Sequence, residues 1–368
     1  DGRGCWLMTA IASNYLTPGP RDEDWRFTPL NRLAGLHDGS AVIGTPMVRN
    51  VSENSGVLVS IIPNQSVPSR IIPTDAVALR TIEYATDILK IEISKETSVA
   101  EPIFIDRTGS SNAGANYERI IISVGAFSKA TVIIQNSGSA NLAEDIEMEL
   151  GNSSDLTFIS LQEWSNDSVH LGRHQAIVGP DAHLTSIEVS LGGSLVRLLP
   201  RVDFEGSGGS VDLYGLYFAG SEQHLEHRVH VEHSTPNCRS RVSYKGALLG
   251  ENARTVWFGD VAIRAKAEGT DTYEVNRNLL LSDGARADSV PNLEIETGEI
   301  VGAGHASTTG RFDDEQLFYL MARGIDETEA RRLVIRGFFA ELLRNIKNEV
   351  IETRLIDHID RELGKVSS

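Results

Sequence analysis

Residues 261–268 read Val-Ala-Ile-Arg-Ala-Lys-Ala-Glu, and this stretch decides the fold class. Its odd-numbered positions are all apolar, whereas three of its four even-numbered positions are charged. Because side chains alternate between the two faces of a strand, a period of two predicts a half-buried strand over these residues. The stretch Leu293-Glu294-Ile295-Glu296 repeats the pattern. We therefore expect a chain built mainly from β-strands.

Turn signals separate many such runs from about residue 41 to residue 309. Clusters of Gly, Asn and Ser lie at residues 108–112, 135–138, 151–154 and 206–209, and these residue types tolerate the positive φ of tight turns. More than 200 residues without a helical pattern are many for a sandwich, and stacking the strands as a solenoid buries them economically. A β-helix is favoured, although no clean repeat period is present, and a large antiparallel barrel is the alternative.

The composition changes near Arg311. Residues 1–312 contain 30 of the 33 glycines and carry a net charge of −14, whereas residues 313–368 contain three glycines, 12 acidic and 9 basic residues. We predict three parts: an N-terminal helical segment over 1–40, a β-helix core over 41–312 and a C-terminal helical domain over 313–368. In the first part, the charged run 21–28 and the leucines up to Leu36 predict a small amphipathic helical piece packed on the core.

Three patterns predict helices in the C-terminal part. The first begins at the acidic turn 313–315 and ends at the cap Gly324. The second begins at Asp326, which forms a capping pair with Glu329, and its expected apolar face is Ala330, Leu333, Val334, Gly337, Phe338 and Leu342. The third repeats every four residues at Ile351, Leu355, Ile359 and Leu363 and ends at Gly364. The spacing leaves open whether it is continuous with the second.

Charge and composition exclude several classes of partner. The chain holds 51 acidic and 34 basic residues, a formal net charge of −17, and 40% of its residues are hydrophobic. This composition is typical of a globular protein, and its charge repels phosphate backbones and anionic lipid, so neither nucleic acid nor a membrane is an expected partner. No run approaches the roughly 20 apolar residues that span a bilayer.

Cys5 and Cys238 are the two cysteines of the chain. A secreted disulfide framework needs more of them, so a reducing cytoplasm is the expected location. The apolar run at residues 5–12 is the one candidate export signal, but it is short and follows an Asp instead of a basic region. An iron–sulfur cluster takes about four thiolates, so this chain would have to share a cluster site with another protein.

Four histidines lie in residues 224–233, namely His224, His227, His230 and His233. On a strand, His227 and His233 share the face of apolar neighbours, whereas His224 and His230 lie on the other face among charged residues. We interpret them as two core histidines with hydrogen-bonded rings and two surface histidines; a zinc site is the less favoured alternative. The metalloprotease motif H-E-x-x-H is absent.

Other catalytic motifs are also absent. The chain has neither a G-x-x-x-x-G-K-[ST] phosphate loop nor a G-x-S-x-G elbow, so we expect neither ATP hydrolysis nor a serine nucleophile. Cys238 lies beside an arginine that favours its thiolate, but a buried, inert thiol is the preferred interpretation. His305 lies among small residues in the segment 300–310. Small neighbours allow a ligand or another backbone to approach, so His305 is a candidate binding residue.

Several ordered blocks resemble the SufB/SufD family of iron–sulfur cluster assembly proteins. They are residues 223–228, 244–246, 278–282, 291–295, 304–306, 314–320 and 323–325. The resemblance is strongest from about Glu222 to Arg344, and residues 22–28 also look like the N-terminal segment of the SufD branch.

Two features separate the branches of this family, and one position departs from many members of the SufD branch. SufB-type chains carry a scaffold cysteine ahead of the strand that here contains residues 278–281, and this chain has no cysteine after Cys238. SufB-type chains follow the junction histidine with glutamate, where this chain has Ala306. Many SufD relatives have a cysteine at the position of Ala303, so a role for that thiol does not carry over, whereas His305 does. The chain therefore resembles the SufD branch.

The resemblance implies both a fold and a role. The fold is a right-handed parallel β-helix with helical N-terminal and C-terminal pieces. The expected partners are a SufB-like paralogue at the β-helix end and a SufC-like ABC ATPase on the C-terminal helices, with a possible homodimer when the chain is alone. His305 would lie at the SufB interface and, with a SufB thiolate, hold iron or a transient iron–sulfur cluster. Neutral imidazole is a good ligand for iron. No catalysis by the chain itself is expected.

Two other function classes stay open. A β-helix enzyme acting on acidic polysaccharide would use the carboxylate pairs Asp203/Glu205 and Glu294/Glu296 as general acid and base. Against it, an acidic protein is poorly suited to meet an anionic polymer. A purely structural β-solenoid binding module is the second alternative.

Overall fold

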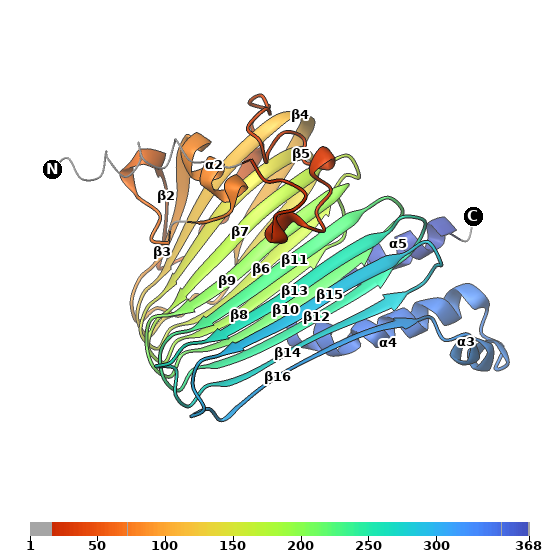
Figure 1. The fold of residues 1–368 in the computed structure, drawn as a ribbon. Helices are drawn as coiled ribbons and strands as arrows, with labels where there is room; N and C mark the ends of the chain where they lie inside the picture. Colours follow the sequence, from red (N-terminus) through yellow and green to blue (C-terminus); the bar gives the residue numbers. More distant parts are fainter. Residues whose placement is uncertain (1–16, 72, 347, 367–368) are drawn as a thin grey trace.

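The computed structural model describes residues 17–71, 73–346 and 348–366. At its centre lies a parallel β-solenoid of about eight turns, whose strands stack along one axis (Figure 1). Its strands are β4 (Ile103–Val124), β5 (Lys129–Leu150), β6 (Asp155–Trp164), β7 (Val169–Val178), β8 (His183–Ser190), β9 (Leu195–Phe204), β10 (Ser210–Ala219), β11 (His224–His233), β12 (Arg239–Leu248), β13 (Arg254–Ile263), β14 (Asp271–Leu280), β15 (Arg286–Ile295) and β16 (Gly302–Arg311).

Two walls of strands face each other across the solenoid. The even wall pairs β6, β8, β10, β12, β14 and β16 in that order, and the odd wall pairs β7, β9, β11, β13 and β15. Strand β5 begins both, because Lys129–Gly138 pairs with β6 and Asn141–Leu150 pairs with β7. Gly138 lies at this corner with φ +76°, a conformation that glycine adopts without steric cost. Every ladder from β4 to β16 is parallel. The expected β-helix is confirmed, and the antiparallel barrel is wrong.

The elements that precede β4 either extend its sheet or pack on the outer face of the odd wall. They are η1 (Glu23–Trp25), η2 (Leu30–Arg32), β1 (Val48–Val51), β2 (Val57–Pro63), η3 (Asn64–Ser66), α2 (Ala76–Tyr84) and β3 (Asp87–Ile93). The short helix α2 was not expected from the sequence. The Asp75 side chain caps it, accepting from the backbone N–H groups of Val77 at 2.9 Å and Ala78 at 3.1 Å.

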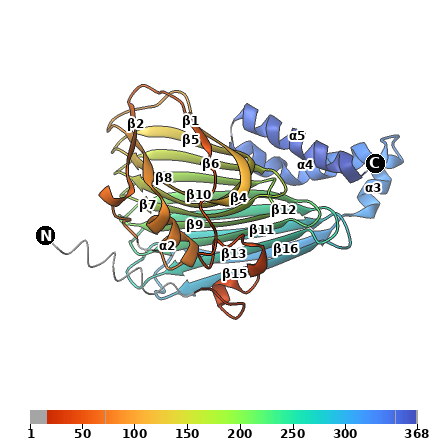
Figure 2. The same cartoon turned by 90° about the horizontal axis from the view of Figure 1, so that it is seen from above.

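Three hydrophobic clusters hold these parts together. The largest fills the interior with side chains from both walls, including Leu142, Phe158, Tyr217 and Trp257. A second joins the outer face of the even wall to the C-terminal helices, and a third joins the outer face of the odd wall to the N-terminal segment and α2. Figure 2 shows the C-terminal helices and the N-terminal segment on opposite sides of the solenoid.

The strand predicted over residues 261–268 ends earlier than its alternating pattern indicates. Strand β13 ends at Ile263, and residues 265–269 form a turn in which Ala267 is fully buried. The apparent alternation over 264–268 therefore reflects an inward-folded turn. Of the expected turns, 151–154 and 206–209 are confirmed, whereas 108–112 and 135–138 lie within the long strands β4 and β5. In these two strands the chain bends without losing its ladder pairing.

The C-terminal helices are α3 (Asp314–Met321), α4 (Glu327–Ile346) and α5 (Glu349–Val366). The predicted caps are confirmed, since Asp326 accepts from the Glu329 N–H at 3.0 Å and Gly324 has φ +88°. Helix α5 is separate from α4, and it continues past Gly364.

The expected apolar face of α4 is partly wrong. Leu333 is 41% exposed, whereas Ile335 and Phe339, absent from that face, are fully buried against the even wall. Ala330 and Leu342 are buried as expected. Because α4 contacts both the wall and α5, its buried surface is wider than one stripe.

The predicted N-terminal helical piece is instead two short 3-10 helices, η1 and η2. Its apolar residues do pack on the core as expected, since Trp25, Leu33 and Leu36 are buried. The candidate export segment 5–12 lies outside the described residues.

Candidate functional site

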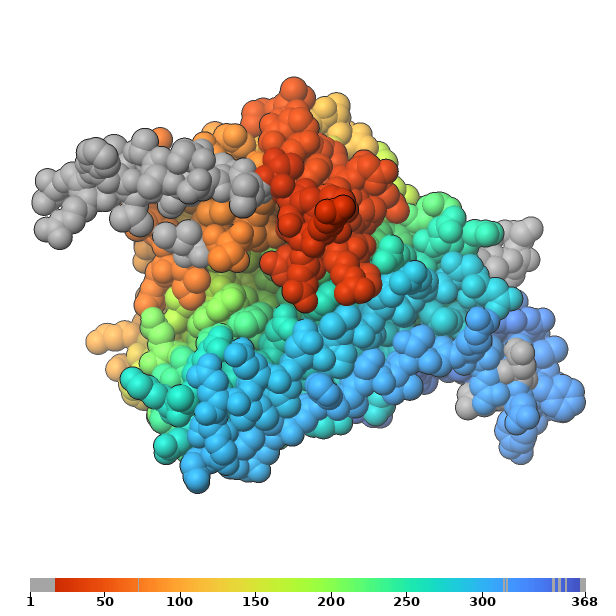
Figure 3. Space-filling model, viewed as in Figure 1, coloured from red at the N-terminus to blue at the C-terminus, as the bar shows by residue number. Residues whose placement is uncertain are grey.

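His305 lies in β16, at the end of the even wall. Strand β16 pairs with β14 on one side and, among the described residues, is the last strand of its wall. The His305 side chain is 44% exposed, because in the described part of the chain no further turn of the solenoid covers it. Figure 3 shows the last strands uncovered at the surface. His305 therefore presents an accessible imidazole at the open end of the solenoid, with the small residues Gly304 and Ala306 beside it.

Glu274 lies directly beneath His305 in the neighbouring strand. The β14–β16 register pairs the two residues, and Oε1 of Glu274 is 3.9 Å from Nδ1 of His305. The Glu274 side chain is 1% exposed, and neither of its oxygens has a hydrogen-bond partner among the described residues. Burial, together with the nearby charge of Asp260, raises the pKa of Glu274 to about 8.

A polar cluster supports β14 from inside. The Tyr217 hydroxyl accepts from Asn276 Nδ2 at 2.7 Å and donates to Asn278 Oδ1 at 2.9 Å. The Ser289 hydroxyl donates to Asn276 Oδ1 at 2.6 Å and so ties β15 to β14. Because these buried groups satisfy one another, they fix the strand that carries Glu274.

No sequence pattern pointed to Glu274 as a site residue. Positions 272, 274, 276 and 278 point into the solenoid, yet their residues are Thr, Glu, Asn and Asn. A period of two made of polar residues is typical of an outward face. Only the register of the finished solenoid places this carboxylate next to His305.

The four histidines of β11 do not converge. His227 and His233 are core residues as expected, and their Nε2 atoms lie 3.1 Å from Ser190 Oγ and 2.9 Å from Ser240 Oγ. His230 lies on the outer face. The expectation for His224 is wrong, since it is buried with Nε2 3.0 Å from Glu226, where the N-terminal segment covers the odd wall and Thr28 also donates to Glu226. Among the residues that the structure describes, no group of three or more His, Cys, Asp or Glu could hold a metal ion.

Cys238 is a buried thiol, as expected. Its side chain lies 3.4 Å from the carbonyl oxygen of Gly206, and burial raises its pKa. A raised pKa keeps the sulfur protonated near neutral pH and makes it a poor nucleophile.

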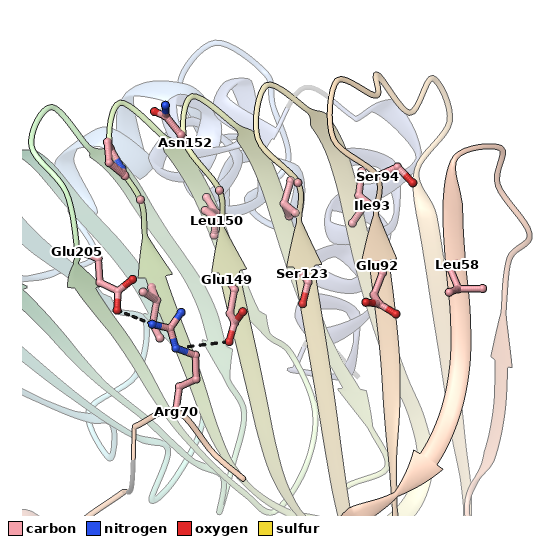
Figure 4. Close-up of a pocket in the computed structure, with 16 residues that line it drawn as sticks. Leu58, Arg70, Glu92, Ile93, Ser94, Ser123, Glu149, Leu150, Asn152 and Glu205 are labelled. Atoms are coloured by element: carbon pink, nitrogen blue, oxygen red, sulfur yellow. Dashed lines mark hydrogen bonds and ion pairs between the residues drawn. The ribbon is translucent and has the colours of Figure 1, made fainter. Parts of the chain in front are cut away.

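Arginines neutralise the carboxylate pairs of the polysaccharide hypothesis. Arg70 lies between Glu149 and Glu205 in a hollow of about 600 Å³ on the outer face (Figure 4), with Nη2 2.6 Å from Glu205. Asp203 accepts from Arg201 at 3.0 Å. Glu294 and Glu296 both contact the guanidinium of Arg264. Carboxylates held in ion pairs are poor general acids, so this geometry does not favour that hypothesis.

Comparison with known proteins identifies the family. Residues 106–338 match the model of the SufBD core domain of the SUF system for iron–sulfur cluster assembly. The chain belongs to the SufBD family. This match spans the solenoid from β4 to the first half of α4 and includes His305 and Glu274.

Individual SufBD relatives agree with this assignment. The chain is 48% identical to a SufBD family protein of Mycobacterium tuberculosis H37Rv, over 95% of this chain and 90% of the relative. It is 25% identical to the iron–sulfur cluster assembly protein SufD of Escherichia coli K12, over 94% and 89%. A second SufBD family protein of the same M. tuberculosis strain is 28% identical over 52% of this chain and 22% of its own length.

No helix in the described part of the chain is long and apolar enough to cross a membrane.

Proposed function

We propose that this chain is a SufD-like, non-catalytic subunit of a cytoplasmic SufBCD-type complex that assembles nascent iron–sulfur clusters. The observation that carries the proposal is the exposed imidazole of His305 at the uncovered end of a SufBD solenoid. In this complex a SufB-like paralogue binds that end, and the cluster is a cargo held between the two subunits.

Two observations support the SufD branch. The similarity to SufD of E. coli extends over nearly the whole chain. The chain also has no cysteine after Cys238, and the Cys238 thiol is buried just before β12, two strands from β16 in the even wall. In this proposal, the sulfur ligands of a cluster at His305 come from the partner. The presence of two SufBD proteins in M. tuberculosis fits a pair of unlike subunits.

The ligand properties of imidazole suit a residue that binds a cluster and later releases it. A neutral imidazole nitrogen is a borderline ligand that suits ferrous iron. A donor contributed from across a subunit interface departs with its subunit, so a cluster held in this way can be released when the interface opens.

The C-terminal part, residues 313–368, is the proposed docking unit for a SufC-like ATPase. Helices α4 and α5 are anchored to the even wall, whereas α3 projects from it with exposed apolar side chains. These are Phe318, Tyr319 and Met321, which are 73%, 55% and 43% exposed. Contiguous exposed apolar residues on a helix are typical of a protein-binding surface.

Replacement of His305 tests the proposal. In the complex reconstituted with its SufB-like and SufC-like partners, His305→Ala should leave folding and subunit binding intact and abolish cluster assembly. His230→Ala, a histidine on the outer face of β11, is the matched control and should assemble clusters at the normal rate. Undiminished assembly by His305→Ala would refute the proposed role.

A further inference from the structure

Glu274 differs from the other buried carboxylates of the solenoid. Glu144 contacts Arg107 at 2.6 Å, Glu188 contacts His174 at 2.6 Å, and Glu226 contacts Arg228 at 2.6 Å. Glu274 has no such partner within hydrogen-bond distance among the described residues. A buried carboxylate without a partner destabilises the fold, so its presence calls for a role outside folding.

Its neighbours fix where the Glu274 carboxylate lies. Across the interior, the odd wall has Gly259, and a Cβ atom placed there would be 2.3 Å from Oε2 of Glu274 and 2.4 Å from the Trp257 ring. Any side chain at position 259 would therefore displace the carboxylate or the indole. The glycine makes room for a carboxylate that extends across the narrow interior, with the His305 imidazole next to it toward the open end.

The orientation of the pair matches a recurring arrangement at metal sites. The imidazole nitrogen nearest to Glu274 is Nδ1, 3.9 Å from Oε1. A histidine that binds a metal through one nitrogen commonly donates the N–H of its other nitrogen to a carboxylate, which fixes both the tautomer and the ring plane. A hydrogen bond requires the exposed ring to rotate until Nδ1 lies within about 3.2 Å of Oε1.

We propose that Glu274 is the positioning residue for His305: its carboxylate accepts the Nδ1–H of the imidazole and leaves Nε2 directed outward, toward iron held by the partner subunit. This inference rests on the proposed function of His305. The proposed hydrogen bond assigns a role to a buried carboxylate that has no hydrogen-bond partner among the described residues.

The tautomer of His305 is the first readout. In the full chain with nitrogen-15 histidine, at about pH 9, ordinary imidazoles are neutral. The nitrogen shifts of His305 should then report a proton on Nδ1. Glu274→Met, which keeps the volume but removes the acceptor, should move the proton to Nε2. Glu274→Gln keeps an acceptor oxygen and should retain the Nδ1–H form. An unchanged tautomer in Glu274→Met would overturn the inference.

Metal affinity is the second readout. In the complex with the SufB-like partner, titration with Co²⁺ should give an affinity about 10- to 100-fold weaker for Glu274→Met than for the wild-type chain. Exposed Glu294→Gln on β15 is the matched control and should bind Co²⁺ normally. Thermal unfolding should show Glu274→Met to be at least as stable as the wild type, so that weaker binding is not a folding defect. Normal affinity in Glu274→Met would also overturn the inference.

The two proposals fail in different ways. If His305→Ala loses Co²⁺ and clusters while Glu274→Met keeps both, the role of Glu274 is wrong and the proposed function stands. If His305→Ala binds Co²⁺ and assembles clusters normally, the proposed function itself is wrong.

Discussion

His227, His233 and His305 lie in two different environments, the buried core and the exposed end of the solenoid. His227 and His233 are buried and neutral, and desolvation lowers their pKa values to about 3 and about 4. His305 is exposed at the end of the solenoid, where a ligand can reach it. The alternation of β11 identified His227 and His233 as core residues, whereas His305 was singled out by its small neighbours and, above all, by the resemblance to the SufB/SufD family. The sequence could not show that the N-terminal segment buries His224.

The buried histidines predict acid sensitivity. Their folded-state pKa values lie below the unfolded value of about 6.5, so the unfolded chain binds more protons between pH 6.5 and about 4. Stability is therefore lost as the pH falls through this window. For His233 the loss is roughly 3 kcal/mol at pH 4. In urea unfolding, His233→Gln should lose less stability between pH 7 and pH 4 than the wild type. If His233→Gln lost as much stability as the wild type between pH 7 and pH 4, protonation of His233 would not be a cause of the acid sensitivity.

Gly246 lies against the Tyr217 ring inside the solenoid, so its replacement should lower the free energy of unfolding. A Cβ atom at position 246 would lie 1.9 Å from the Tyr217 ring, whereas one at position 302 would meet nothing within 4 Å. Gly246→Ala should therefore cost about 3 kcal/mol through overpacking, and Gly302→Ala should stay within about 0.5 kcal/mol. Chemical denaturation measures both variants. Equal stabilities would show that the interior relaxes freely around Tyr217.

At the scale of elements, α4 anchors the C-terminal part while α3 stays available. Phe339 is fully buried against the even wall, and Phe318 on α3 is 73% exposed. The helices themselves could be predicted from caps and periodicity. The face of α4 could not, because a helix held between a wall and another helix buries residues that a single amphipathic stripe leaves out.

The two phenylalanines predict separable effects. Phe339→Ala should destabilise the chain by about 3–5 kcal/mol, because it leaves a cavity between α4 and the even wall. Phe318→Ser should leave unfolding unchanged and weaken binding of the SufC-like ATPase, measured by calorimetry with the isolated partner. If Phe318→Ser bound the SufC-like ATPase with wild-type affinity, the docking surface would not lie on α3.

At the scale of the whole molecule, the solenoid explains why no repeat was visible. Val169 pairs with Leu195, a spacing of 26 residues, whereas Arg239 pairs with Asp271, a spacing of 32 residues. Turns of such different length erase a fixed period, although the ladder stays in register. The sequence therefore predicted many strands and a solenoid, but neither the two walls nor the partners of each residue across them.

An uncovered last turn predicts assembly. Parallel strands with a free edge invite pairing with another chain, and the edge strands β15 and β16 lie at the end that carries His305. When the untagged chain is expressed with tagged SufB-like and SufC-like neighbours, it should co-purify with them and with iron. Recovery of the tagged proteins without this chain would contradict the assembly.

The most direct test of the proposed function is to detect the bond between His305 and iron. The complex is reconstituted with nitrogen-15 histidine in this chain alone, the cluster is reduced, and electron spin echo spectroscopy records the nuclei coupled to it. If His305 binds the cluster, the spectrum should contain a nitrogen-15 coupling that disappears in His305→Ala. A loaded wild-type cluster without that coupling would show that His305 is not its ligand.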